Sequence, residues 1–348
     1  MKKNVVSTNA YLHLIAWVFL FGGCKSAKEA TTYDFPKPVD TTSKPLVTQV
    51  KQEYVTESGL SADNRFNGAR LNGFVQLNDS LFEATISPEN IPINNSAWYA
   101  FKLWSSIPKD NYIRLVYSSG KHRYHPKWSK DGKSWSLLSA DQILFDADSI
   151  NVTLKLETNR DTLWIAAQEI EDSKSGQLWC EQIATSPQVE LTSIGWSPGG
   201  RSINFLTMGK GKKVIVIFSR QHPPEVTGYY AMQAFVSGVL SSSMSDSFFE
   251  EYTFLIYPLI NPDGVDLGHW RHNSGGVDLN RDWAYYRQPE TKMVANHLVN
   301  ELKKMKGKVI LGLDFHSTYH DVYYTLDKNK IQSPTIPWFR EQWFAGLE

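Results

Sequence analysis

The chain has 348 residues, of which 41% are hydrophobic, so it is long enough for two domains with apolar cores. Its 36 basic and 36 acidic residues give a formal net charge of zero. Because nucleic-acid-binding domains usually carry a basic surface, this balance argues against nucleic acid as a partner.

The N-terminus is typical of an export signal, which we expect to span residues 1–23. Two lysines precede an apolar stretch from Tyr11 to Phe21 that is too short for a membrane span. The sequence Phe21-Gly22-Gly23-Cys24 resembles a bacterial lipoprotein signal, in which the cysteine becomes the lipidated first residue. It predicts an exported protein of the bacterial cell envelope, in the periplasm or at the cell surface, with a lipid on Cys24 as its membrane anchor. The alternative is a plain secretory peptide with an incidental cysteine.

Residues 24–46 are rich in Ser, Thr, Pro and Lys and poor in large apolar side chains. Such a segment buries too little apolar surface to offset the entropy that it loses on ordering. We therefore expect a flexible tether before the first domain.

Residues 47–187 carry the pattern of an all-β domain. Apolar and polar residues alternate from Asn151 to Glu157, and a turn at Asn159-Arg160-Asp161 precedes a further strand. The pair Asp131-Gly132 lies between two tryptophans and is typical of a β-hairpin. Many short strands separated by polar turns indicate an antiparallel sandwich. Similar short strands are expected at Leu81–Ile86, Ala97–Trp104 and Tyr112–Tyr117.

From residue 188 onward the pattern changes to strands that alternate with helices. A continuous apolar run is typical of a strand buried on both faces, and spacing of apolar residues by three and four is typical of a helix. This order indicates an α/β domain with a largely parallel mixed sheet that is covered by helices on both faces. We predict strands at Lys213–Ser219, Tyr252–Tyr257 and Val309–Phe315, and helices at Val226–Leu240 and Pro289–Met305.

The ends of two of these strands carry candidate metal ligands. His222-Pro223-Pro224-Glu225 follows the first strand, and His316 directly follows the third. In α/β folds with such a sheet, bound molecules and ions lie beyond the carboxyl ends of the strands. A catalytic zinc takes three nitrogen or oxygen ligands and keeps one position open. A His-x-x-Glu pair alone also arises by chance, but with His316 beside it the pattern predicts one Zn²⁺ bound by His222, Glu225 and His316.

The segment between these ligands carries three further motifs. They are Asn261-Pro262-Asp263-Gly264, Trp270-Arg271 and Gly276-Val277-Asp278-Leu279-Asn280-Arg281-Asp282-Trp283. With them the chain resembles the zinc metallocarboxypeptidase family typified by pancreatic carboxypeptidase A. The preceding sandwich is similar to the N-terminal domain of the branch that includes cytosolic carboxypeptidases. The resemblance implies that His222, Glu225 and His316 are the zinc ligands.

The resemblance also implies roles for four other residues. Arg271 would polarise the scissile carbonyl, Asn280 and Arg281 would hold the terminal carboxylate of the substrate, and Asp278 would orient His222. The chemistry of the side chains agrees, because a guanidinium can grip a carboxylate through two parallel hydrogen bonds. A carboxylate behind a metal-binding imidazole likewise fixes its tautomer. Each arginine taken alone is more commonly part of a surface ion pair.

The implied activity is hydrolysis of the C-terminal peptide bond of peptides or proteins, with zinc activating water and a carboxylate base taking its proton. The family's base is a glutamate on a later strand, and no residue from Ser317 to Glu348 matches its motif. We therefore expect residues 188–348 to be a zinc carboxypeptidase-like domain whose C-terminal part is missing. Two alternatives stay open: a protein that binds zinc and peptide C-termini without cleaving them, and a zinc amidase or deacylase on a related scaffold.

Overall fold

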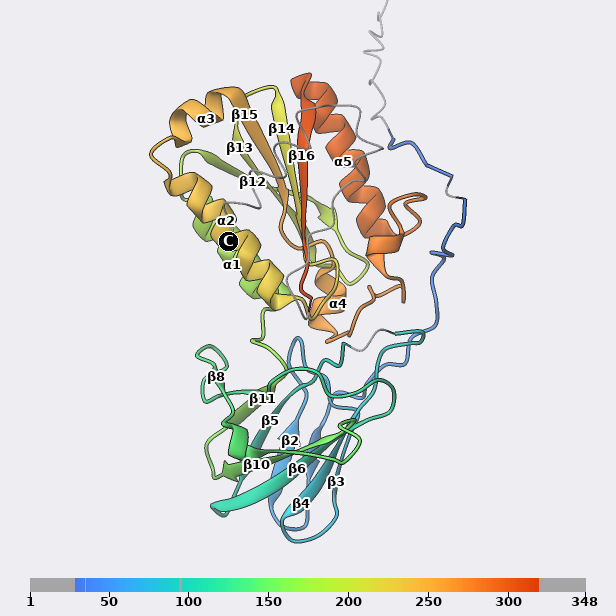
Figure 1. The fold of residues 1–348 in the computed structure, drawn as a ribbon, viewed down its shortest axis with the longest axis vertical. Helices are drawn as coiled ribbons and strands as arrows, with labels where there is room; N and C mark the ends of the chain where they lie inside the picture. Colours follow the sequence, from blue (N-terminus) through green and yellow to red (C-terminus); the bar gives the residue numbers. More distant parts are fainter. Residues whose placement is uncertain (1–28, 35, 94–95, 319–348) are drawn as a thin grey trace, which may run out of the picture.

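The computed structural model describes residues 29–34, 36–93 and 96–318, which form two domains stacked along the long axis of the molecule (Figure 1). The predicted signal and Cys24 lie outside these ranges, so export, the lipid anchor and the cell-envelope location stay predictions. Within the same ranges, helices that are both long and apolar enough to cross a membrane are absent.

The lower domain in Figure 1 is a β-sandwich. One sheet has the strand order β1-β2-β5-β11-β7-β8 and the other β3-β4-β6-β10-β9. Alternating burial, as in β4, turns one face of each sheet toward a common apolar core. The elements are β1 (Glu53–Val55), β2 (Leu60–Asp63), β3 (Gly73–Gln76), β4 (Leu81–Ile86), β5 (Ala100–Ser105), β6 (Lys109–Tyr117), β7 (Lys127–Ser129), β8 (Ser136–Leu137), η1 (Ala140–Gln142), β9 (Ile143–Phe145), β10 (Val152–Thr158) and β11 (Leu163–Ala166).

The sandwich differs from the prediction in two details. β4 and β6 are parallel neighbours, so the second sheet is mixed rather than purely antiparallel. The predicted domain extends to residue 187, but β11 ends at Ala166 and α1 (Ser173–Ile183) is a helix that contacts the sheet of the next domain. The reason is packing: Gly176 and Cys180, four residues apart on one side of α1, are buried, and Cys180 belongs to the core under that sheet.

The upper domain is built on one mixed sheet with the strand order β12-β13-β15-β14-β16. β14 is parallel to β15 and to β16, whereas β12 and β13 extend one edge in antiparallel fashion. Helices α1 and α2 cover one face and α5 covers the other (Figure 1). The elements are β12 (Val189–Trp196), β13 (Ser202–Gly209), β14 (Lys213–Ser219), α2 (Val226–Ser241), α3 (Ser245–Glu251), β15 (Tyr252–Tyr257), α4 (Pro262–Asp266), η2 (Leu279–Arg281), α5 (Pro289–Met305) and β16 (Lys308–Phe315). The predicted fold class, an α/β domain after an all-β sandwich, is confirmed.

The described part of the expected tether lies against the upper domain. It has neither helix nor strand, as its composition indicates, but specific hydrogen bonds hold it. Lys44 N donates to Gly275 O (2.8 Å), and Gln288 Nε2 donates to Thr41 O (2.7 Å). The segment therefore passes along the loop 273–288, which carries the candidate residues for substrate binding.

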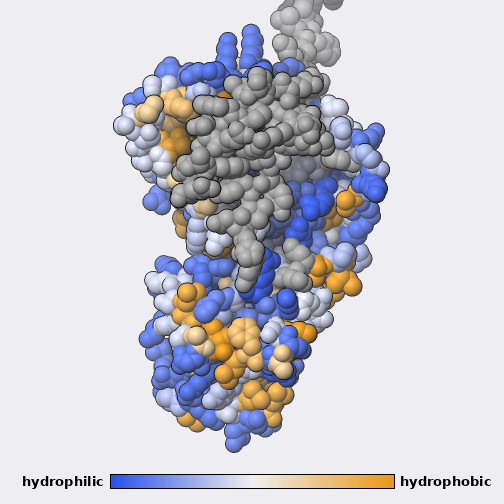
Figure 2. All heavy atoms as spheres, viewed as in Figure 1, coloured by the Kyte–Doolittle hydropathy of each residue, from blue (hydrophilic) through white to orange (hydrophobic). Residues whose placement is uncertain are grey.

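An apolar contact joins the two domains. Trp270 comes from the upper domain, yet its side chain is fully buried in the sandwich core. Its Nε1 donates to Trp98 O (3.0 Å), and Gly120 allows the close approach of the ring, since a Cβ at Gly120 would lie 3.2 Å from it. The sandwich surface in view carries both hydrophobic and hydrophilic side chains (Figure 2). The ring of Trp270, by contrast, is buried where the two domains meet.

Candidate metal centre

Two adjacent parallel strands bring the histidines of the site together. β14 ends at Ser219 and β16 ends at Phe315, and these two residues are register partners in the sheet. His222 follows the first strand end and His316 the second. Both side chains therefore lie beyond the same carboxyl edge of the sheet, where an α/β fold binds its ligands.

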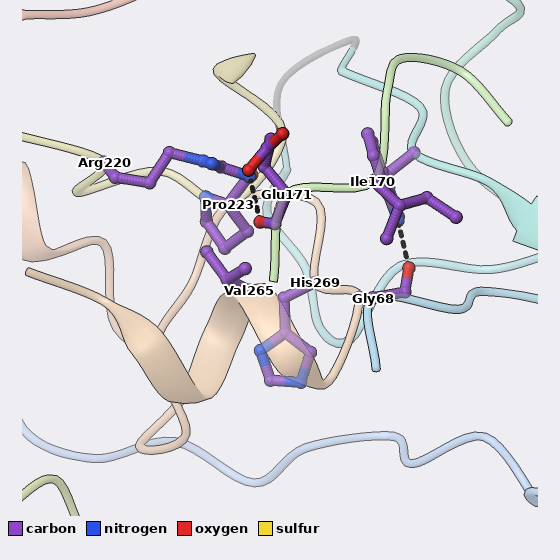
Figure 3. Close-up of a pocket in the computed structure, with 9 residues that line it drawn as sticks. Gly68, Ile170, Glu171, Arg220, Pro223, Val265 and His269 are labelled. Carbon is purple, nitrogen blue, oxygen red and sulfur yellow. Dashed lines mark hydrogen bonds between the residues drawn. The ribbon is translucent and has the colours of Figure 1, made fainter. Parts of the chain in front are cut away.

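The loop that carries His222 and Glu225 is held rigidly. Arg220 has a left-handed backbone (φ 55°) and is buried. It donates from Nε to Pro223 O (3.0 Å) and from Nη2 to Glu171 O (3.1 Å; Figure 3). The cavity beside it has a volume of ≈ 10 Å³, which leaves room for about one water molecule and none for a peptide. This cavity is therefore too small to be the binding site of a peptide.

The first turn of α2 positions the third ligand. A Cβ at Gly228 would lie 2.5 Å from His316 O, so only glycine permits this contact between helix and strand end. Thr227 Oγ1 donates to Ser317 Oγ (2.8 Å), which also accepts from Gly228 N (2.8 Å). Glu225 is the residue directly before α2. The same helix start therefore fixes Glu225 and docks His316 against it.

The three candidate ligands form a compact cluster. Ligand atoms of His222, Glu225 and His316 all lie within 4.8 Å of one another, and among the described residues no other group of this kind is found. Nδ1 of His222 lies 2.9 Å from Glu225 Oε1, and Nδ1 of His316 lies 2.8 Å from Glu225 Oε2. Two imidazole nitrogens and one carboxylate are the donor set of a catalytic zinc site with an open position.

Each histidine bonds a second carboxylate through its other ring nitrogen. His222 Nε2 donates to Asp278 Oδ1 (2.9 Å), and His316 Nε2 donates to Asp314 Oδ2 (2.9 Å). A proton held on Nε2 leaves the Nδ1 lone pair for a metal, as in carboxylate–histidine–zinc arrangements. The residues present thus fit a zinc ion, which His222, Glu225 and His316 would hold.

The contacts within the cluster also shift its pKa values. Burial alone would raise the pKa of Glu225, but its hydrogen bonds with His222 and His316 outweigh this effect and lower the pKa to about 2. Burial lowers the pKa of His316, yet its hydrogen bonds with Asp314 and Glu225 outweigh burial and raise the pKa to about 10. Because a histidine binds a metal through a free lone pair, metal binding at Nδ1 of His316 would compete with a proton.

Asp278 connects the cluster to Arg271. Its Oδ1 accepts from His222 Nε2, and its Oδ2 accepts from Arg271 Nε (2.7 Å). Asn280 Nδ2 lies 3.5 Å from His316 Nε2. Arg281 is exposed at the rim of the site, where Nη1 donates to the carbonyl of Asn280 (3.3 Å). The structure therefore brings the predicted ligands, Asp278, Arg271 and Asn280 to one place and leaves Arg281 at its solvent side.

Sequence patterns miss a second hydrogen-bond chain, which ends at His316. Trp283 Nε1 donates to Gln221 Oε1 (2.7 Å), and Gln221 Nε2 donates to Asp314 Oδ2 (2.7 Å), the atom that also accepts from His316. Strand alternation could have identified Asp314, because residues two apart in a strand point to the same face. Gln221 and Trp283 carry no such signal, since they are 62 positions apart.

We expect the change Asp314→Ala to lower zinc affinity by about 10- to 100-fold, because His316 loses the acceptor that fixes its tautomer. Asp314 is one-third exposed, so the fold should survive the change. Competition with a metallochromic chelator measures the affinity, and Asp141→Ala on exposed η1 is the matched control. Unchanged zinc affinity in a folded Asp314→Ala protein would show that the contact does not support the ligand.

Comparison with known proteins identifies the upper domain. Residues 177–342 match the family model described as zinc carboxypeptidase. The chain carries a zinc carboxypeptidase domain. The match begins within α1, which agrees with the packing of this helix on the carboxypeptidase sheet rather than on the sandwich. The predicted family is therefore confirmed.

Relatives with known names belong to the same family. Cytosolic carboxypeptidase 2 of Xenopus tropicalis is 34% identical over 149 residues, which cover 38% of this chain and 15% of the relative. The Danio rerio protein of the same name is 24% identical over 298 residues, which cover 75% of this chain and 41% of the relative. The chain spans about half the length, or less, of the curated relatives that it matches first.

The fold of this chain is also similar to a solved structure. A metallo-carboxypeptidase from Burkholderia cenocepacia superposes with a TM-score of 0.61 at 22% sequence identity, covering 75% of this chain and 71% of that chain. At this identity the similarity concerns the fold. It agrees with the two-domain architecture described above.

Proposed function

We propose that this protein is a zinc-dependent metallocarboxypeptidase that hydrolyses the C-terminal peptide bond of peptides or proteins. One observation carries the proposal: Asp278 joins His222 of the metal cluster and Arg271 in a single, partly buried network. The family and its carboxypeptidase relatives support the same reaction class. The contact of Arg271 with the carboxylate that bonds His222 supports hydrolysis, because it places a cation beside the metal cluster.

A zinc ion held by His222, Glu225 and His316 would supply Lewis-acid activation of a water molecule and of a carbonyl group. Asp278 keeps the proton of His222 on Nε2 and holds Arg271 through Nε. Among the described residues, the Arg271 guanidinium has a hydrogen-bond partner at Nε alone, so its terminal nitrogens can donate to a ligand. A permanent cation there meets the charge that develops on a carbonyl oxygen during hydrolysis.

Arg281 and Asn280 would bind the terminal carboxylate of the substrate. The guanidinium of Arg281 is exposed, next to a site whose inner side is formed by Asn280 and His316. Guanidinium groups pair with carboxylates through two parallel hydrogen bonds, which selects substrates with a free C-terminus. The glutamate base that the family resemblance implies stays a prediction, because none of the described residues is assigned to it.

The reaction class is tested by product analysis with the protein made from its whole open reading frame. Matched substrates would be a peptide with a free C-terminus, its C-terminal amide and an N-acylated amino acid. We expect release of the terminal amino acid from the free peptide alone. Turnover of the acylated amino acid without release from peptides would favour an amidase or deacylase. Peptide binding without turnover would favour a binding protein.

We expect Arg281→Ala to raise KM for free-carboxylate peptides by about 10- to 100-fold, the loss of one or two charge-assisted hydrogen bonds. kcat should change much less, since Arg281 is not one of the candidate metal ligands and its side chain donates to the carbonyl of Asn280. Arg287→Ala is the matched control, because Arg287 is also an exposed arginine of the loop 273–288 and pairs with Asp40. An equal loss on the amidated peptide would contradict the anchoring role.

A further inference from the structure

Outside the cluster, the sandwich domain holds the chain segment that leads to Arg271. Arg70 of the sandwich is buried and donates from Nε to Gly268 O (2.7 Å) and from Nη2 to Leu267 O (3.4 Å). These carbonyls follow directly after the short helix α4. A buried arginine thus satisfies backbone acceptors at the beginning of the segment.

Glu89 of the sandwich holds the other end of the same segment. Its carboxylate accepts three successive backbone N–H groups, those of Trp270 (2.7 Å), Arg271 (2.9 Å) and His272 (2.8 Å). It also bonds Nδ1 of His272 (2.7 Å). The hydrogen bonds found for this side chain all cross from the sandwich to the carboxypeptidase domain, so they cannot serve the sandwich fold itself.

The burial of Glu89 is complete, with 0% of the residue exposed. A buried carboxylate is tolerated only when it is hydrogen-bonded, and both oxygens of Glu89 accept: three hydrogen bonds reach Oε1 and one reaches Oε2. Burial would raise the pKa of Glu89, but the hydrogen bond with His272 and the charges of His269 and Arg70 hold that pKa well below its usual range. Apolar side chains would join two domains as well or better, so a buried anion here indicates a need for directed contacts.

Two further contacts help to fix the position of Arg271. On one side its neighbour Trp270 is anchored in the sandwich core. On the other side the guanidinium donates to Asp278, which bonds His222. The backbone of Arg271 is therefore fixed by a sandwich carboxylate, and its side chain by a carboxylate of the metal site.

We propose that Glu89 of the sandwich domain is a positioning residue for the carboxypeptidase reaction, because it holds the backbone of Trp270–His272 and so places the guanidinium of Arg271 beside the metal ligands. This inference rests on the function proposed above. It gives the sandwich a role in the active site although it supplies none of the predicted zinc ligands.

The test is the change Glu89→Gln, which keeps the size of the side chain but replaces one acceptor oxygen by a donor. A displaced Arg271 should lower kcat by about 10- to 100-fold, since misplacement by about 1 Å can cost that much, with zinc stoichiometry unchanged. Asp63→Asn is the matched control, because Asp63 is a buried sandwich carboxylate whose bonds stay within the sandwich. If Glu89→Gln does not fold, Glu89→Asp takes its place, because it keeps the charge. A lowered kcat of Glu89→Asp would support the positioning role, and an unchanged kcat would contradict it.

A double-mutant cycle separates positioning from general stability. If Glu89 acts through Arg271, Glu89→Gln should lower kcat no further in the Arg271→Ala protein. Full additivity of the two losses, or a folded Glu89 variant with unchanged kcat, would overturn the proposal.

Amide hydrogen exchange provides a readout that needs no catalysis. In Glu89→Gln the amides of Trp270, Arg271 and His272 should exchange faster, whereas Asp63→Asn should leave them unchanged. A wild-type protein without peptidase activity would refute the proposed function. Even in that case, exchange of these three amides still tests whether Glu89 holds the segment. Unchanged exchange in Glu89→Gln would refute that role of Glu89.

Discussion

Replacing Glu225 by alanine is expected to lower zinc affinity by more than about 100-fold and to abolish peptidase activity with it. The carboxylate is the one anionic ligand of the cluster and faces Nδ1 of both His222 and His316. Loss of a direct ligand should exceed the 10- to 100-fold cost typical of losing a residue that only supports a ligand. Zinc content after dialysis, measured beside peptide hydrolysis, tests the expectation.

Glu181→Ala provides the control for this change, because Glu181 is an exposed glutamate of α1 that does not belong to the metal cluster. Its zinc content and activity should equal those of the wild type. A Glu225→Ala protein that keeps one tightly bound zinc would place the metal elsewhere, and the assignment of the cluster would be wrong.

Replacing Arg271 by alanine should lower kcat by about 10²- to 10³-fold, the cost of removing one donor that stabilises a developing oxyanion. Zinc should remain bound, because Asp278 still bonds His222 and accepts from Asn280 N (2.9 Å). Because the interaction strengthens only as the reaction proceeds, kcat and kcat/KM should fall together. Steady-state kinetics of zinc-loaded protein measures both.

For comparison, Arg160→Ala removes an exposed arginine of the sandwich and should leave the kinetics unchanged. Arg271→Lys is informative as well, since lysine keeps the charge but cannot reproduce the planar contact with Asp278. A rise in KM at constant kcat for Arg271→Ala would show that Arg271 binds substrate in the ground state instead of acting on the carbonyl.

The sequence predicts the central strands of the α/β domain closely, since β14 and β15 are almost fully buried. The strands β14 and β15 and the helix α5 have the predicted bounds, and β16 begins one residue earlier than predicted. A strand buried on both faces is a continuous apolar run, and α5 combines proline at its start with regularly spaced apolar residues. In β14, β15 and α5 the local pattern and the tertiary environment agree, so the sequence alone predicts where these elements begin and end.

Elements at the edges of the domains are less predictable. β12 is an edge strand with mostly exposed or half-buried residues, so it lacks a regular apolar alternation. α1 was not predicted, because it has only two buried residues and follows directly after a β-rich domain. The parallel pairing of β4 with β6 is set by contacts between distant segments, which no short window of sequence contains.

The residues of the candidate site also differ in whether the sequence predicts them. His222, Glu225, His316, Asp278 and Arg271 are predicted from order and motif, and the fold brings them together. Glu89 has no local signal, because it lies 181 to 183 positions from the groups that it binds. Its role depends on how the two domains pack, which is a property of the tertiary structure alone.

Zinc dependence is tested most directly by peptide hydrolysis by the protein from its whole open reading frame, followed through removal and return of zinc. We expect about one zinc per chain, release of the C-terminal amino acid, loss of that release with a chelator, and its recovery when one equivalent of zinc is added back. Hydrolysis that persists after complete zinc removal would contradict the proposed zinc-dependent reaction. So would a fully zinc-loaded protein that releases no C-terminal residue from any peptide.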